Sequence, residues 1–79
     1  MNRMISYTDL MAVFKRKFAG YDQYQCECAM LDCRDTLQRL GETPDSEYGR
    51  KLWCEIDAIR DRQMQIARNV RELKAMVAQ

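Results

Sequence analysis

A heptad repeat of apolar residues runs through the second half of the chain. Two rows recur every seven positions: Leu52, Ile59, Ile66 and Leu73 in one, and Ile56, Gln63, Val70 and Val77 in the other. A repeat sustained for about four heptads predicts one long helix with an apolar seam. Gln63 is the single polar member. It either sets the register or oligomeric state of the pairing, or is a polar residue tolerated near solvent.

Glycine and proline indicate where the helices end. One proline and three glycines in 79 residues allow long helices and leave a strand-rich fold short of turns. The one clear turn is "GETPD". Gly41 is expected as a left-handed C-cap, with Thr43 as the next N-cap and Pro44 as the first residue of the next helix.

These signals predict an all-α fold, an antiparallel helical hairpin with coiled-coil-like packing. The chain is expected to be one helical domain over 1–79. Its first helix is predicted over about 7–40 and its second over about 44–77, with a turn at 41–43. The first helix folds back to cover the heptad seam of the second.

The first helix has a clear start and an ambiguous middle. Ser6 is expected as its N-cap with Asp9 at the third helical position, and Ile5 and Leu10 as a hydrophobic staple. Apolar residues keep their phase through Gly20, which favours one continuous helix. Three residues on the seam-facing side there are poor core: Arg16, Ala19 and Gln23. We therefore favour a kink or break near 19–20, with a separate short N-terminal helix before it.

The segment 21–40 is apolar on two opposite sides at 100° per residue. The first side carries Cys26, Met30, Cys33, Leu37 and Leu40, and the second carries Tyr21, Tyr24, Cys28 and Leu31. The first side can cover the seam. The second has no cover in the chain unless the N-terminal segment folds back. A helix that is apolar on both sides is normally buried on both sides, so we expect a homo-oligomer or a subunit of a heteromeric complex.

The expected partner or oligomer interface extends from that second side to one flank of the second helix. Trp53 and Met64 lie on this flank, and Ala67 lies between them around the helix axis. Aromatic residues and methionine are enriched in interface cores. The alternative is that this flank packs on the N-terminal segment. The candidate interface residues are Leu10, Phe14, Tyr21, Tyr24, Leu31, Trp53 and Met64.

The four cysteines do not have the spacing of a structural zinc site, which uses paired knuckles on loops. On a helix, Cys26 and Cys28 point in nearly opposite directions, and Cys54 is predicted on the outward side of the second helix. We expect no metal and no other cofactor. Cys33 is expected to face Ile56 as ordinary core, and Cys54 to be exposed and the thiol most open to reaction.

The composition disfavours catalysis and a membrane span. The chain has no histidine, which excludes a histidine-based triad, and no glycine-rich phosphate loop, so we expect no enzyme. It has no apolar run of the roughly 18 residues that a span needs and no signal-peptide pattern, which predicts a cytoplasmic protein with reduced thiols.

The only basic cluster is "FKRKF", with Lys15, Arg16 and Lys17 spread around the helix. It is a solvated face, a contact for an acidic protein, or a contact for nucleic acid. A net charge of +1 disfavours general nucleic-acid binding. We expect a small protein-binding module of the inhibitor, adaptor or co-chaperone type, as bacteria and their phages often use, an analogy at the level of the fold. The alternative is a nucleic-acid-associated regulator acting through residues 15–17.

Overall fold

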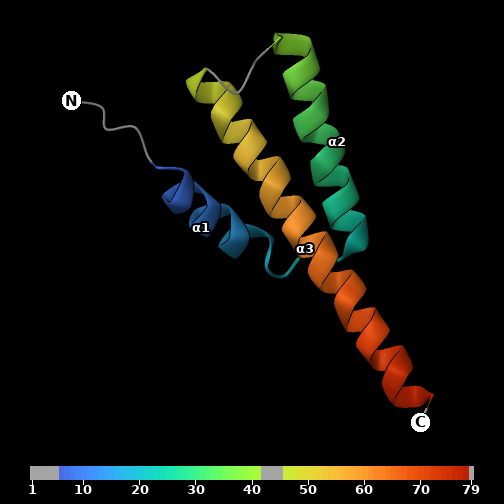
Figure 1. Cartoon of the computed structure of the whole chain (residues 1–79). Helices are drawn as coiled ribbons and strands as arrows, with labels where there is room; N and C mark the ends of the chain where they lie inside the picture. The colour runs from blue at the N-terminus through green and yellow to red at the C-terminus, as the bar shows by residue number, and fades with distance from the viewer. Residues whose placement is uncertain (1–5, 42–45, 79) are drawn as a thin grey trace.

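The described residues form three helices, and the all-α prediction is confirmed. The structure, a computed structural model, describes residues 6–41 and 46–78. The helices are α1 (Tyr7–Phe18), α2 (Gln23–Leu40) and α3 (Glu47–Val77). Helices α1 and α2 both pack on α3 and lie on either side of its first half (Figure 1). The molecule is elongated, 56 × 27 × 17 Å, because the second half of α3 projects beyond the other two helices (Figure 1).

Three of the helix ends have clear caps, two from serine side chains and one from a glycine in the left-handed conformation. The Ser6 side chain accepts a hydrogen bond from the backbone N–H of Asp9, as predicted. Gly41 ends α2 in the left-handed conformation, with φ of 62°, also as predicted. Helix α3 begins after Ser46, whose hydroxyl accepts from the N–H of Gly49. The staple partner Ile5 and the predicted cap over 43–44 lie outside the described residues.

The predicted break near Gly20 is present. Helix α1 ends at Phe18, and α2 starts behind an N-cap at Asp22. The Asp22 carboxylate accepts from the N–H of Gln25, and the Gln25 side chain accepts from the N–H of Asp22, at 2.8 and 2.9 Å. This capping box satisfies backbone donors that a new helix start leaves free. Gly20 itself has no positive φ, so Asp22 and Gln25 rather than a glycine conformation stabilise the break.

One apolar core lies around the first half of α3. Its buried members are Phe14 and Phe18 from α1, Cys26, Met30 and Cys33 from α2, and Leu52, Cys54, Ile56, Ala58 and Ile59 from α3. The predicted packing of α2 on the heptad seam of α3 is therefore confirmed where the seam is buried, at Leu52, Ile56 and Ile59. Leu37 and Ile66 are half-buried at the edge of the core, and Leu40 at the end of α2 is exposed.

The prediction of an exposed Cys54 is wrong. Cys54 is only 1% exposed, because α1 packs on the side of α3 that faces away from α2. The Tyr7 hydroxyl donates to the Asp57 carboxylate, 3.2 Å away, which joins the start of α1 to the same stretch of α3. Burial raises the pKa of the Cys54 thiol, so the suspected reactivity of Cys54 is not supported either.

The heptad seam is covered for only part of its length. An unbroken helix over 7–40 would have reached most of the seam, but the break sends α1 to the other side of α3. The 18 residues of α2 then face 31 residues of α3. The seam is buried at Leu52, Ile56 and Ile59 and becomes exposed by Val70.

Candidate interaction surfaces

Three side chains form an uncovered apolar stripe on the side of α2 that faces away from α3, here called the outer face of α2. Tyr24 is 73% exposed and Leu31 is 66% exposed, and Cys28 between them is exposed as well. Spacings of four and three residues put all three on one side of a helix. Helix α1 does not cover this stripe, because it packs on α3 instead.

Tyr24 and Cys28 also interact with each other. The neighbouring Cys28 side chain raises the pKa of Tyr24, first through hydrogen bonding and then through the charge of its thiolate form. The Tyr24 ring is largely exposed and carries a hydroxyl group at its edge. An apolar ring with a polar edge is a combination that protein interfaces favour.

Trp53 and Met64 lie three turns apart on one side of α3. Trp53 is 39% exposed, so it is partly covered, and Met64 is largely exposed. The flank and the outer face of α2 supply four of the predicted interface residues at the surface.

The other three predicted interface residues belong to the core of the chain. Phe14 is buried, and Leu10 and Tyr21 pack against the buried cluster. The ring of Phe18 stacks with Phe14, with centroids 6.4 Å apart, and meets the edge of Tyr21 at 4.9 Å. Phe14 is in the core, and Leu10 and Tyr21 are half-buried against it, because the break at residues 19–20 turns α1 back onto α3.

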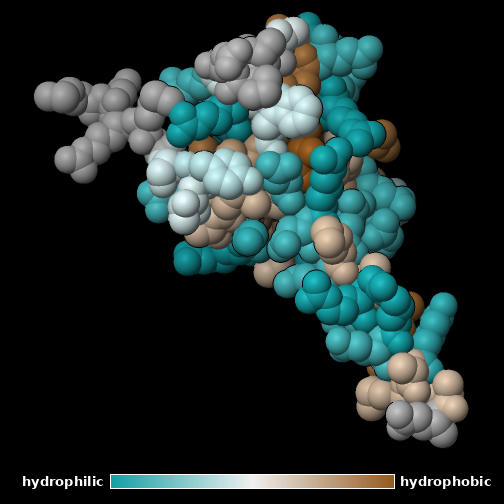
Figure 2. Space-filling model, viewed as in Figure 1, coloured by the Kyte–Doolittle hydropathy of each residue, from teal (hydrophilic) through white to brown (hydrophobic). Residues whose placement is uncertain are grey.

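A further apolar surface was not among the predicted interface residues. The second half of α3, residues 63–77 and here called the α3 tail, exposes Val70, Leu73, Met76 and Val77. Figure 2 shows tan and brown surface at the end of this tail, clear of the rest of the molecule. The heptad repeat is the sequence signal for this surface, although the repeat alone predicts a seam that is covered within the chain.

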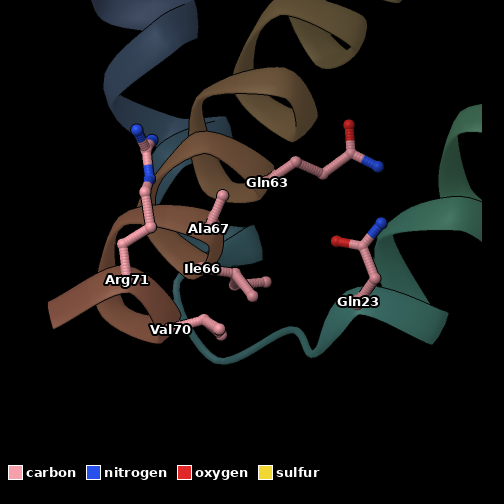
Figure 3. Close-up of a pocket in the computed structure, with 6 residues that line it drawn as sticks. All are labelled: Gln23, Gln63, Ile66, Ala67, Val70 and Arg71. Atoms are coloured by element: carbon pink, nitrogen blue, oxygen red, sulfur yellow. The ribbon is translucent and has the colours of Figure 1, made fainter. Parts of the chain in front are cut away.

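A shallow depression lies at the N-terminal end of α2, where this helix stops covering the seam. It is lined by Gln23, Gln63, Ile66, Ala67, Val70 and Arg71. Gln23 comes from the first turn of α2 and the others from α3, with Ile66 directed into the space between them (Figure 3). The predicted register residue Gln63 is half-buried at this edge, between the covered and uncovered parts of the seam.

The remaining polar groups form no metal site in the described part of the chain. Within residues 6–41 and 46–78, no three cysteine or carboxylate side chains converge on a point that could hold an ion. The Cys33 thiol donates to the Glu55 carboxylate, 3.4 Å away. Burial, and then the Glu55 charge, raise the pKa of Cys33 to about 12, so this thiol is an inert core group.

The basic cluster occupies the last turn of α1. Lys15, Arg16 and Lys17 are exposed, and cations at this end stabilise the helix dipole. The Lys17 ammonium lies 5.3 Å from the centroid of the Phe18 ring, which is a contact within the helix. Nucleic-acid binding through these residues stays a prediction.

Comparison with protein-family models, with curated proteins and with solved structures finds no match to this chain. Among the described residues, no helix combines the length and the apolar character needed to cross a membrane. The functional interpretation therefore depends on the surfaces of the molecule alone.

Proposed function

We propose that this chain is a small non-catalytic protein-binding module that acts through uncovered apolar helix faces. The observation that carries the proposal is the outer face of α2, where Tyr24 and Leu31 are both more than half exposed while the chain has a separate core to stabilise its fold. Large apolar side chains that are aligned on one helix face and left out of the core mark protein contact sites.

The proposed partner is a protein with an apolar groove or helix face. A helix that presents residues at i, i+4 and i+7 matches the helix-in-groove mode of recognition. The expected class is an adaptor, inhibitor or co-chaperone. All four cysteines are free, which is compatible with a reducing compartment, and we propose a cytoplasmic location.

Affinity capture from the producing cell tests this function. The bait variants are wild type, Leu31→Asp and Leu40→Asp. Both leucines are exposed on α2, and the substitution is identical, but Leu40 lies on the opposite side of the helix from Leu31. A desolvated carboxylate without a partner is costly in an interface, so Leu31→Asp should lose a protein that wild type and Leu40→Asp retain. Equal recovery with all three baits would contradict the proposal.

A further inference from the structure

Helix α2 covers the heptad seam only up to a defined level of α3. The Arg62 guanidinium donates from Nε to the carbonyl oxygen of Tyr21, 2.9 Å away, and Gln23 lies at the same depression as Gln63 (Figure 3). The first turn of α2 is therefore level with residues 62 and 63. Beyond this level the seam continues through Ile66 to Val77 for about 20 Å, at 1.5 Å per residue, and neither α1 nor α2 runs along this part of it.

We propose that the α3 tail pairs antiparallel with the α3 tail of a second copy of this chain. The contact continues the α2–α3 interface along the same seam. This dimer uses a different surface from the outer face of α2. It rests on the proposed function only in that both require association through uncovered apolar helix faces.

The spacing of the tail's seam residues is the first argument for a second copy. Ile66, Val70, Leu73 and Val77 follow one another at intervals of four, three and four, and this order reads the same in both directions. A twofold antiparallel pairing therefore places Val70 opposite Leu73 of the second copy. Ile66 comes opposite Val77 in the same way. Each seam residue meets another, as a self-complementary twofold interface requires.

The residues that flank the seam create no charge repulsion in this register. Ala67 comes beside Lys74 of the second copy, and Asn69 beside Met76. Neither pair brings like charges together, a juxtaposition that would oppose pairing. Met76 is exposed in the single chain and adds apolar surface to the contact.

The position of α2 decides the direction of the pairing. In a parallel pairing, the part of the second copy's α3 that precedes residue 63 would have to occupy the space on the seam that α2 already fills. In the antiparallel register, Val77 of the second copy lies level with Ile66, next to the first turn of α2. The negative end of its dipole then faces the positive end of α2. The incoming tail extends the line of α2 along α3.

The size of the contact predicts a reversible dimer. Two helix faces of this length bury about 1,000 Å² in total or less, which is the lower end for specific protein interfaces. We therefore expect a monomer–dimer equilibrium that shifts with concentration rather than an obligate dimer.

Sedimentation equilibrium of the full chain tests the tail. Wild type should approach twice the chain mass of 9.4 kDa as concentration rises. Leu73→Asp should remain at the mass of one chain at concentrations where wild type is mostly dimeric. Ala75→Asp is the matched control, because it adds the same charge two residues away on the outward side of the tail, and it should behave as wild type. A wild type that never exceeds one chain, or a Leu73→Asp variant that dimerises equally, would overturn the proposal.

A nitroxide label on Cys28, the exposed cysteine among the four, tests the direction. Contacts of Tyr21 with Arg62 and of Cys33 with Glu55 place Cys28 level with about residue 58 of α3. In the antiparallel dimer the two labels are then about 40 Å apart along the axis, at 1.5 Å per residue. A parallel dimer would hold both labels at the same level, and the resulting short distance between them would refute the antiparallel arrangement.

The variant Leu31→Asp separates this proposal from the proposed function. It should sediment as wild type, because Leu31 lies outside the tail, even if it captures no other protein. If Leu31→Asp abolished the dimer, self-association would belong to the outer face of α2 and the tail proposal would fail. If the dimer persisted while wild type and Leu31→Asp captured the same proteins, the tail proposal would stand and the proposed function would fail.

Discussion

Arg62 binds the backbone carbonyl of Tyr21, with 2.9 Å between Nε and the oxygen. This hydrogen bond joins the middle of α3 to the connection between α1 and α2. It lies at the boundary between the covered and the uncovered parts of the heptad seam. On one side of it α3 is the centre of a three-helix core, and on the other side it is a single helix with an apolar stripe.

Removing this contact should loosen the connection between the helices. We predict that Arg62→Ala lowers the free energy of unfolding by about 1–2 kcal/mol, because Arg62 is only half-buried and its charged hydrogen bond is partly screened. Chemical denaturation monitored by helical circular dichroism measures this. Arg60→Ala, an exposed arginine on the same helix, is the control and should change stability by less than about 0.5 kcal/mol. Equal effects of the two variants would contradict a specific role for Arg62.

The core prediction concerns Ile59, which is 0% exposed between α2 and α3. Ile59→Ala should cost about 2–5 kcal/mol of stability, through lost burial and the cavity left behind. That is a large part of the stability of a small domain. Met64→Ala removes an exposed side chain from the same helix and should leave the unfolding midpoint almost unchanged. Similar midpoints for both variants would mean that Ile59 is not in a packed core.

The cysteines should differ sharply in reactivity. Under native conditions at neutral pH, one thiol per chain, Cys28, should react rapidly with a maleimide, because the other three are buried. Burial also raises the pKa of each of these three, Cys26, Cys33 and Cys54, and the thiolate is the reactive form. Peptide mapping after a short pulse identifies the modified residue. Modification of Cys54 as fast as Cys28 would show that α1 does not stay packed on α3.

Alkaline pH should weaken the fold through Cys33. Its pKa is raised from 9.0 to about 12, first by burial and then by Glu55. Between these values the unfolded chain gives up the proton and the folded chain keeps it. The stabilisation is therefore complete below pH about 9 and is lost as the pH rises toward about 12. The thermal midpoint of wild type should fall more across this window than that of Cys33→Ala, and parallel losses in the two proteins would contradict the assignment.

Much of the fold could be predicted from local signals. Ser6 with Asp9 and the glycine at position 41 are short-range patterns whose energetics depend on adjacent backbone groups, and both formed as expected. The break near Gly20 could be expected from the poor core residues around it. Its capping box at Asp22 and Gln25 was the stronger signal and was present in the sequence.

The errors arose where tertiary packing decided the outcome. The side of α3 that carries Cys54 looks outward when only a hairpin is considered, and it is buried because α1 crosses over to it. Phe14, which the sequence places at an interface, lies in the core for the same reason. Periodicity identifies which residues share a face but not which of two other helices covers that face, and so the length of seam left open on the tail could not be derived from the repeat alone.

The central claim is that this chain works by associating with other chains through apolar faces that its own fold leaves open. The most direct test is the native mass of the protein in a gently prepared extract of the producing cell, measured by size-exclusion chromatography with light scattering on the enriched protein. We predict a mass clearly above the single-chain value of 9.4 kDa, from a second copy, a different protein or both. A single species at the mass of one chain at every loading concentration would contradict the claim.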